Sequence, residues 1–311
     1  MSLISEISDD VLMTKDELLS FSFTAPRRYK KYHILKRNGN GLRLIAHPSK
    51  EVKFFQRLAI SKLEILLPIH DCAIAYVKGK SIRDNAEAHR RNRYMLKMDF
   101  KNFFMSITPD LFISSLERND INLEAQDIKF LEGVLFWKLR RNSPLRLSVG
   151  APSSPFISNF VMTAFDIFMF GYCKDKGITY TRYADDLTFS TREKDLLFTI
   201  PKVVRDALKE YCNSKIRINS KKTVFTSKKF NRHVTGVTIT NDEKLSLGRE
   251  RKRLISAMVH HFVDDKYSLS HEEIQKLKGY LSFAKSIEPD FINRLSKKYG
   301  REYILKIQSF N

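Results

Sequence analysis

Two adjacent carboxylates, Asp185 and Asp186, lie in the segment 178–190, whose alternating pattern predicts two strands joined by a turn. Like charges this close repel each other unless a cation neutralises them. A polar Asp-Asp turn on the surface is a common alternative, and the dipeptide alone does not exclude it. The neighbouring acids of the sequence decide between the two interpretations.

A third carboxylate, Asp99, ends the apolar segment 94–99, which we predict to be a strand. If this strand pairs beside the hairpin, Asp99 and Asp185 come close enough to share divalent cations. Hard oxygen ligands favour Mg²⁺, which takes one or two carboxylates plus substrate phosphates. Two such ions about 3.5–4 Å apart clamp an in-line phosphoryl displacement. The acids therefore predict two Mg²⁺ ions and phosphoryl-transfer chemistry.

The basic side chains gather in three segments. The 311-residue chain has a formal net charge of +20, and residues 27–53, 78–101 and 209–232 carry +8, +5 and +7 of it. Localised positive charge attracts phosphate backbones, because each neutralised phosphate releases counterions. We therefore expect a nucleic acid as partner, although charge alone does not separate an enzyme from a binding protein.

Composition excludes several classes of protein. A hydrophobic content of 42% is enough for a large core and excludes a disordered basic tail. Three scattered cysteines exclude a disulfide framework, and the acidic, amphipathic N-terminus is unlike a signal peptide, so we expect a reduced, cytoplasmic setting. The apolar segment 156–173 contains Asn159 and Asp166, which favours a buried helix over a membrane span.

The pattern of apolar residues predicts an α+β body followed by a helical C-terminal subdomain from residue 241. Helices are expected over 8–20, after Ser49, from Ser81, over 108–117, within 156–173, over 201–211 and from 248 onward. Strands are expected over 32–35, 42–46, 94–99, twice within 178–190, and over 217–218 and 234–239. The Asn-Gly pairs within 36–41 predict a hairpin turn, and 150–155 a rigid loop.

Four segments together resemble the palm of a reverse transcriptase. Asp99 matches the first catalytic aspartate, and Tyr183-Ala184-Asp185-Asp186 matches the Tyr-x-Asp-Asp box. The Gly-Ala-Pro-Ser-Ser-Pro run at 150–155 is similar to the loop behind the templating base and the incoming nucleotide. The Asn-Ser-Lys-Lys-Thr run at 219–223 is similar to the following palm motif. All four occur in the family's order, and their joint match is far more specific than any one alone.

Two further motifs resemble the bacterial retron branch of that superfamily, which is related to group II intron reverse transcriptases. Residues 85–89 match its Asn-Ala-x-x-His box, and residues 234–236 match its Val-Thr-Gly box. With them, the resemblance covers residues 27–285. One departure is Val149, where many relatives have Gln, and it puts a side-chain contact to the nucleotide at this position in doubt.

The resemblance implies a right-hand polymerase fold of the α+β class, with fingers, a palm of antiparallel sheet plus helices, and a C-terminal helical thumb. Residues 1–26 would form an N-terminal helical extension. Residues 27–240 would form the interleaved fingers and palm, and 241–311 the thumb, which binds RNA or the product duplex.

The resemblance also implies roles at the reaction centre. Asp99 and Asp185 would bind both metal ions, Asp186 would complete the catalytic triad as an outer ligand or support, and the Phe100 carbonyl would be an extra ligand. Lys222 would protonate the leaving pyrophosphate, with Lys221 as the alternative.

The incoming nucleotide would meet a second group of residues. Phe104 would act as a steric gate against a ribose 2′-hydroxyl, while Phe103 is expected in the core. Arg43 would clamp the triphosphate, with Lys36 or Arg37 as alternatives. The remaining predicted nucleotide contacts are Gly150, Ala151 and Pro152.

RNA and primer contacts are expected from the retron motifs and the thumb. Asn85 and His89 are four residues apart and share one helix face, where either binds RNA or braces the fold. By resemblance, Val234, Thr235 and Gly236 hold the primer terminus or the RNA stem. The thumb face expected to grip the duplex is Arg249, Arg251 and Lys252.

The expected function is that of a retron RNA-directed DNA polymerase. The resemblance implies that it copies part of a cognate non-coding RNA, from the 2′-hydroxyl of an internal guanosine, into branched RNA–DNA. The expected partners are that RNA, its DNA product, dNTPs, a host RNase H for template trimming and an effector protein in anti-phage defence, with no membrane. Two alternatives stay open: a bacterial reverse transcriptase with 3′-hydroxyl priming, and a nucleic-acid-binding scaffold or antitoxin with secondary chemistry.

Overall fold

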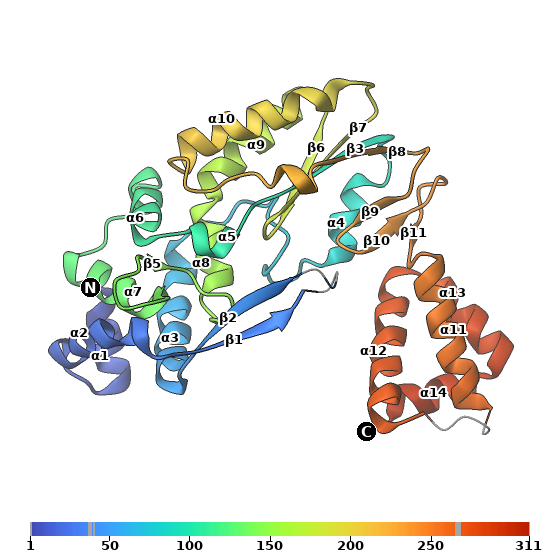
Figure 1. Ribbon diagram of the computed structural model, residues 1–311, viewed down its shortest axis with the longest axis horizontal. Coiled ribbons are helices and arrows are strands. Elements are labelled where there is room, and N and C mark those ends of the chain that lie inside the picture. Colours follow the sequence, from blue (N-terminus) through green and yellow to red (C-terminus); the bar gives the residue numbers. More distant parts are fainter. Residues whose placement is uncertain (1, 37–38, 40, 265–268, 311) are drawn as a thin grey trace. The chain divides into compact units, whose positions relative to one another are not determined.

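The structure is a computed structural model that describes residues 2–36, 39, 41–264 and 269–310 (Figure 1). Arg37, Asn38 and Asn40 of the predicted turn at 36–41 lie outside the described residues. The chain divides into two compact units. The first comprises Met1–Lys78, Lys97–Thr188 and Asp195–Val224, and the second Gly79–Leu96, Phe189–Lys194 and Phe225–Asn311.

The first unit begins with two helices, α1 (Leu3–Val11) and α2 (Lys15–Thr24), so the prediction of one helix over 8–20 is wrong. Leu12 ends α1 in the left-handed region with φ 54°, and Thr14 starts α2 in a capping box with Glu17. These local signals outweigh the continuous amphipathic pattern, because a cap satisfies backbone donors that a helix end leaves unpaired.

A two-stranded hairpin follows, as the sequence predicts. β1 (Tyr29–Leu35) and β2 (Leu42–Pro48) pair antiparallel, with Tyr29 opposite Pro48 and Leu35 opposite Leu42. The Ser49 side chain then accepts a hydrogen bond from the Val52 backbone and starts α3 (Lys50–Leu66). Figure 1 shows the hairpin and α3 in blue.

A four-stranded sheet in the order β6-β7-β3-β8 carries the three acids. Its strands are β3 (Tyr94–Asp99), β6 (Thr179–Tyr183), β7 (Asp186–Thr191) and β8 (Val224–Ser227). The predicted strand over 94–99 and the predicted hairpin within 178–190 are therefore confirmed. The predicted strand at 217–218 is reduced to one antiparallel bridge between Phe100 and Ile218.

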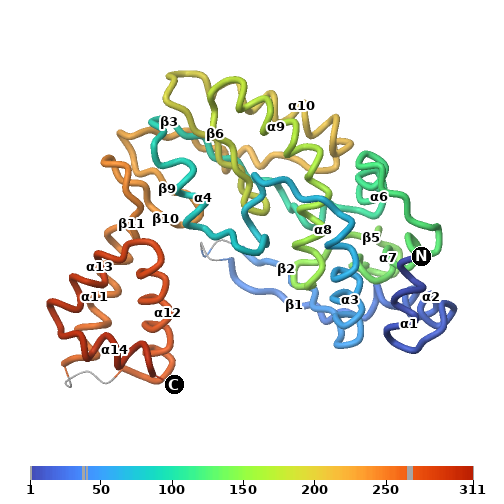
Figure 2. Tube along the Cα trace, turned by 180° about the vertical axis from the view of Figure 1, so that it is seen from behind, coloured from blue at the N-terminus to red at the C-terminus, as the bar shows by residue number. Residues whose placement is uncertain are grey.

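Helices complete the first unit. They are α5 (Phe103–Ser106), α6 (Pro109–Arg118), α7 (Ala125–Leu135), α8 (Ser154–Val161), α9 (Thr163–Asp175) and α10 (Ile200–Tyr211), with a short ladder of β4 (Trp137–Lys138) and β5 (Leu145–Arg146). The prediction of one buried helix within 156–173 is wrong, because α8 and α9 meet at a 52° bend (Figure 2). No single described helix is long and apolar enough to span a membrane, and the bent pair meets that test only when both helices are counted together.

A buried polar network explains why Asn159 and Asp166 interrupt this apolar segment. Arg182 of β6 is fully buried, and its guanidinium donates to both Asp166 carboxylate oxygens, at 2.6–3.0 Å. Its Nη1 also donates to Asn159 Oδ1 at 3.0 Å and to the Ala184 carbonyl at 3.1 Å. Burial alone would lower the pKa of Arg182, but the Asp166 charge raises it overall. The two helices are thereby tied to the turn that precedes Asp185.

The second unit combines a helix, a small sheet and four C-terminal helices. Its elements are α4 (Ile82–His89), β9 (Arg232–Val234), β10 (Val237–Ile239), β11 (Leu245–Ser246), α11 (Arg249–Val263), α12 (His271–Ile287), α13 (Pro289–Tyr299) and α14 (Arg301–Ser309). One apolar cluster includes Ala86, Val234 and Ile255 from three of these elements. The predicted helical C-terminus is confirmed, while the predicted boundaries at 26 and 240 stay predictions.

The prediction of one strand over 234–239 is wrong. The segment contains the end of β9, a tight turn and β10. Val234 pairs with Val237, and the two residues between them, Thr235 and Gly236, both have positive φ, 47° and 83°. Two left-handed residues are what a type I′ hairpin needs. Thr235 is β-branched, and β-branched residues rarely adopt a left-handed backbone. The sequence pattern therefore predicted a continuous strand.

The Arg182 network predicts a large and specific loss of stability. Asp166→Asn leaves the buried guanidinium without a counter-charge and should lower the free energy of unfolding by about 3–5 kcal/mol. Glu243→Gln, which breaks the partly exposed pair with Lys228, should cost less than about 1 kcal/mol. Urea denaturation followed by circular dichroism measures both. Equal losses for the two variants would contradict the assigned role of the network.

Candidate active site

One backbone hydrogen bond holds Asp185 beside the end of β3, and a second holds Asn219 beside Asp99. The Phe100 N–H donates to the Asp185 carbonyl at 3.0 Å, and the Asn219 N–H donates to the Asp99 carbonyl at 2.7 Å. β7 and β3 are neighbours in the sheet, so the pairing that the sequence analysis required is present. Asp185 stands in the turn between β6 and β7, directly after Ala184, whose backbone is left-handed with φ 57°.

The Asp99 carboxylate is held by two donors. Lys222 Nζ lies 2.5 Å from Asp99 Oδ2, and Asn219 Nδ2 donates to Asp99 Oδ1 at 3.1 Å. Asp99 is buried, whereas 58% of the Lys222 side chain is exposed. The hydrogen bond to Asp99 is the main cause that raises the pKa of Lys222. Lys222, rather than the adjacent Lys221, is thus the lysine that contacts the acids.

The electrostatic environment disfavours three ionised acids at once. Burial, followed by the charge of Asp99, raises the pKa of Asp185. Partial desolvation, followed by the charges of Asp185 and then Asp99, raises the pKa of Asp186 to about 6, although its side chain still reaches solvent. Lys222 acts in the opposite direction on both carboxyl groups. The site therefore holds more negative charge than its own cations neutralise.

This charge imbalance fits a divalent cation. The carboxylates of Asp99 and Asp185 and the Phe100 carbonyl are hard oxygen donors at neighbouring strand ends. Among the described residues, no three acidic, histidine or cysteine side chains gather closely enough to form a complete metal site by themselves. Such a set suits Mg²⁺, which usually keeps waters and takes the rest of its ligands from substrate phosphates.

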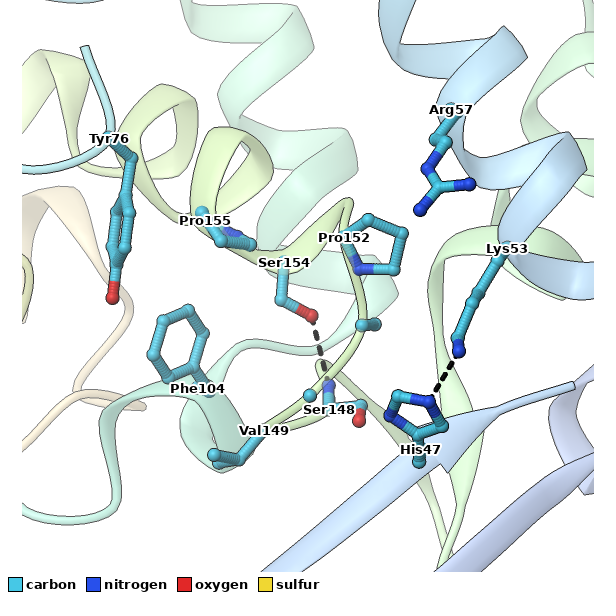
Figure 3. A pocket seen from close by; sticks show the side chains of 12 residues that line it. His47, Lys53, Arg57, Tyr76, Phe104, Ser148, Val149, Pro152, Ser154 and Pro155 are labelled. Carbon is cyan, nitrogen blue, oxygen red and sulfur yellow. Dashed lines mark hydrogen bonds between the residues drawn. The ribbon is translucent and has the colours of Figure 1, made fainter. Parts of the chain in front are cut away.

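A pocket of about 350 Å³ lies between β2, α3 and the loop at 148–155 (Figure 3). The predicted nucleotide residues Phe104, Gly150, Ala151 and Pro152 all line it. Phe103 is buried, while Phe104 is partly exposed and its ring faces the pocket beside Tyr76 (Figure 3). The predicted division between a core Phe103 and a pocket-facing Phe104 agrees with this placement.

The loop at 148–155 is fixed by backbone contacts with β2. The Ala46 N–H donates to the Val149 carbonyl at 3.0 Å, and the Ser148 hydroxyl donates to the Ala46 carbonyl. Gly150 has φ 121°, and a Cβ there would lie 3.1 Å from Ile45 Cγ2. Only glycine combines this backbone with this close approach. Val149 thus positions the loop through its main chain, which needs no glutamine.

Several residues that were not predicted from the sequence also line this pocket. His47, Lys53 and Arg57 stand at one end, where Lys53 contacts His47, and Tyr76 stands at the other (Figure 3). The helical spacing of Lys53 and Arg57 after Ser49 was the available signal. Burial, then the charge of Asp185, raises the pKa of Tyr76.

Arg43 is exposed on β2 and acts electrostatically on the acids. Its charge opposes the rise in the pKa of both Asp185 and Tyr76. The triphosphate role of Arg43 stays a prediction. Of the two alternatives, Arg37 lies outside the described residues, and Lys36 is exposed at the end of β1.

In the second unit, Asn85 and His89 are fully buried, which contradicts direct contact of either side chain with RNA. His89 Nδ1 lies 2.6 Å from Ser190 Oγ, and Asn85 Nδ2 lies 3.5 Å from Thr235 Oγ1. The second interpretation, that they brace the fold, agrees with these contacts. The sequence separation of four placed both residues on one helix face but did not show whether that face is exposed or buried.

The exposed part of the Val-Thr-Gly motif is its turn. Val234 is buried, Thr235 is partly exposed and Gly236 is exposed. Arg251 donates to the Gly236 carbonyl at 3.2 Å, and Lys252 pairs with Glu288 at 3.1 Å, so both have partners within the protein. Arg249 is exposed at the start of α11. Of the three cations predicted to grip a duplex, Arg251 and Lys252 already have partners within the protein, whereas Arg249 is exposed.

Comparison with known proteins gives consistent matches. Residues 34–239 match the family model "Reverse transcriptase (RNA-dependent DNA polymerase)". The chain is 48% identical to the retron Ec83 reverse transcriptase of Escherichia coli, over 91% of this chain and 90% of that one. It is 34% identical to the retron Ec73 reverse transcriptase of Escherichia coli, over 97% and 96%. A Candida albicans telomerase structure aligns with a TM-score of 0.49 at 14% identity, over 96% of this chain and 63% of that chain.

The buried His89 predicts a pH-dependent stability. Burial lowers the pKa of His89 to about 3, whereas an unfolded histidine titrates near 6.5. The unfolded state therefore binds more protons than the folded state between these values. The stabilising contribution of neutral, buried His89 is thus full above pH 6.5 and is lost as the pH falls. At pH 5 the loss should be about 2 kcal/mol.

Urea denaturation between pH 5 and pH 8 measures this effect. His89→Gln should flatten the fall in unfolding free energy below pH 6.5, while His33→Gln, at an exposed position of β1, should leave the slope as in the wild type. An unchanged slope in His89→Gln would show that other groups cause the acid sensitivity.

Proposed function

Because the chain belongs to the reverse transcriptase family, within it to the retron reverse transcriptases, and so is an RNA-directed DNA polymerase, we propose that it makes branched RNA–DNA from a cognate non-coding RNA. In this proposal the RNA is both template and primer, and synthesis starts from the 2′-hydroxyl of an internal guanosine. The observation that supports the chemistry most directly is the placement of Asp99 and Asp185 on neighbouring strand ends, with Lys222 on Asp99.

The proposed reaction is a nucleotidyl transfer. The primer hydroxyl gives its proton to water, and its oxygen forms a bond to the α-phosphorus of a dNTP. The bond between the α-phosphorus and the bridging oxygen breaks, and pyrophosphate leaves with the electron pair. Two Mg²⁺ ions bound by Asp99, Asp185 and the Phe100 carbonyl, with Asp186 beside them, would supply positive charge at the attacking and leaving oxygens.

The protein's own groups have separate tasks in this proposal. Lys222 carries a proton at Nζ and gives it to the leaving pyrophosphate, since its raised pKa keeps it protonated at neutral pH. Arg43 binds the triphosphate with its planar guanidinium. Phe104 excludes a ribose 2′-hydroxyl through van der Waals overlap, because its ring faces the pocket between the loop and Tyr76.

RNA recognition is assigned to exposed groups of the second unit. The turn at Thr235 and Gly236 and the side chain of Arg249 reach solvent, so they are free to meet the RNA stem or the product duplex. Asn85 and His89 act indirectly by supporting that turn and its neighbours. Arg251 and Lys252 would have to exchange their intramolecular partners to bind RNA.

The wider proposal includes partners and setting. A host RNase H would trim the template, and an effector protein would act with the polymerase in defence against phage, in the cytoplasm. Priming from a 3′-hydroxyl is the alternative within the same family. A scaffold or antitoxin whose chemistry is secondary is the alternative of another class, and the charge cluster of Asp99, Asp185 and Asp186 argues against it.

A double substitution of the acids tests this proposal in cells that express the neighbouring RNA. Asp185→Asn with Asp186→Asn should reduce DNA synthesis at least 1,000-fold, because the site loses two of its three carboxylates. Asp9→Asn with Asp10→Asn removes a similar adjacent pair on the exposed end of α1 and should leave synthesis intact. The co-purifying nucleic acid is quantified and sequenced before and after debranching.

Each outcome of that experiment has a distinct meaning. Wild-type DNA levels in the Asp185/Asp186 variant would refute the assigned catalytic acids. DNA that is linear without debranching would favour 3′-hydroxyl priming. Loss of DNA with phage resistance retained would favour the scaffold alternative.

A further inference from the structure

Leu12, at the turn between α1 and α2, combines two unfavourable features. Its side chain is 94% exposed, and its backbone is left-handed, with φ 54°. Glycine most often ends a helix in this conformation, because the Cβ of any other residue crowds the neighbouring carbonyl oxygen. An apolar side chain that is exposed on a strained backbone is an outlier that points to a function outside folding.

The turn that carries Leu12 is fixed from both sides. The Ser8 hydroxyl donates to the Met13 carbonyl, and the Met13 N–H donates to the Ser8 carbonyl at 3.3 Å. Directly after this turn, Thr14 forms the capping box with Glu17 that starts α2. The leucine is therefore presented on a preformed turn.

The two helices that carry this turn are firmly packed on α7. The Ile4 N–H of α1 donates to the buried Asp127 carboxylate at 2.8 Å. Gly133 of α7 lies against α2 so closely that a Cβ there would stand 2.3 Å from the Ser22 carbonyl oxygen. The surface around Leu12 thus exists before any partner binds, so little ordering of the chain opposes binding.

Two further apolar side chains are exposed on the same surface. Ile65 and Leu66, at the end of α3, are 85% and 48% exposed. Lys62, one turn earlier on the same face of α3, pairs with Asp10 of α1 at 2.9 Å. Leu12 follows Asp10 by two residues, so all three apolar residues lie within about one helical turn of this ion pair. We call Leu12, Ile65 and Leu66 the N-terminal surface.

The N-terminal surface is surrounded by acids, in a chain that is strongly basic. Residues 1–20 carry five acidic side chains and one lysine, although the whole chain has a net charge of +20. Asp16 and Glu17 are exposed shortly after Leu12, and Glu64 is exposed directly before Ile65. Carboxylates repel phosphates, so neither a nucleic acid nor an anionic lipid surface suits this part of the chain.

The N-terminal surface also lies apart from the polymerase chemistry. Figure 1 and Figure 2 both show α1 and α2 at one end of the first unit, away from β6. Neither pocket of the first unit is lined by any residue of α1 or α2. Nothing in the proposed nucleotidyl transfer uses Leu12, Ile65 or Leu66.

We propose that the N-terminal surface docks another protein, through a contact segment that carries both apolar and basic side chains. Apolar side chains of the partner would cover Leu12 and Ile65, which releases water from exposed hydrocarbon. Lysine or arginine side chains of the partner would face Asp16, Glu17 and Glu64, and this charge pattern selects a basic segment over an acidic one. The contact adds a function beyond polymerisation and leaves the basic surfaces free for nucleic acid.

A second copy of the chain is the competing occupant. Its segments 27–53, 78–101 and 209–232 carry +8, +5 and +7, so they have the charge that the N-terminal surface would attract. The same three segments are the ones expected to bind nucleic acid. A copy that is loaded with RNA and DNA has this charge neutralised, which favours a different protein as the partner.

Photo-crosslinking of the full chain, in cells that carry its native locus, tests the proposal. p-Benzoylphenylalanine replaces Ile65 in one strain, and Leu305 of α14, a 51% exposed leucine, in the control strain. Adducts are purified under denaturing conditions, and mass spectrometry identifies the peptide attached at the crosslink.

The expected result is a protein adduct at position 65 that is absent at position 305. Its crosslinked peptide should contain more lysine and arginine than aspartate and glutamate. Asp16→Asn with Glu64→Gln should lower the yield of this adduct at least tenfold. Asp206→Asn with Glu210→Gln, a matched neutralisation on the exposed face of α10, should leave the yield unchanged.

Leu12→Gly separates docking from folding. Glycine adopts the left-handed backbone without strain, so the urea midpoint of this variant should not fall below that of the wild type. The adduct at position 65 should nevertheless fall at least tenfold, while DNA synthesis continues at the wild-type level. Asp185→Asn with Asp186→Asn tests the polymerase proposal separately, since it should abolish DNA synthesis and keep the adduct.

Several results would overturn the docking proposal. They are the absence of a protein adduct at position 65, an adduct with nucleic acid, lipid or a second copy of the chain, and a protein adduct whose yield Leu12→Gly or the neutralised acids leave unchanged.

Discussion

A guanidinium without access to solvent must place its donors on protein acceptors, and Arg182 meets this requirement with Asp166, Asn159 and the Ala184 carbonyl. Its backbone also bonds to the segment at 72–74, and Asn159 bonds to the Ala75 carbonyl. One buried residue thus connects α8, α9, the β6–β7 turn and the chain that leads to Tyr76. The position of Asp185 depends on this network, because the turn that carries it has a strained, left-handed Ala184.

The cluster of Asp99, Asp185 and Asp186, unlike the Arg182 network, does not balance its own charge. Asp99 is buried and satisfied by Asn219 and Lys222, whereas Asp185 and Asp186 have raised pKa values because burial and neighbouring carboxylates disfavour their charge. The Arg182 network, three residues before Asp185, balances its own charge, whereas the three acids hold more negative charge than the neighbouring cations neutralise. Such a contrast is typical of a site that receives its missing positive charge from metal ions.

Much of this arrangement was accessible from the sequence, and the failures have physical causes. Asp99 at a strand end and the Asp185–Asp186 turn followed from an apolar strand end and an alternating hairpin. The pairing of their strands was only a condition in the sequence, and the structure meets it. The helices at 8–20 and 156–173 were predicted as single because amphipathic pattern does not show a left-handed Leu12 or a bend at Met162. His89 was assigned to RNA because periodicity gives the face of a helix but not its burial.

The central claim is that the Arg182 network positions Asp185 for nucleotidyl transfer. Arg182→Lys tests it most directly, because lysine keeps the charge but loses the planar fork that reaches Asp166, Asn159 and the Ala184 carbonyl together. The measurement is the single-turnover rate of nucleotide incorporation at saturating dNTP, which reports on the folded, duplex-bound fraction. The account predicts a rate about 100-fold below that of the wild type, since small misplacement of reacting groups costs about this much. A wild-type rate in the folded variant would contradict it.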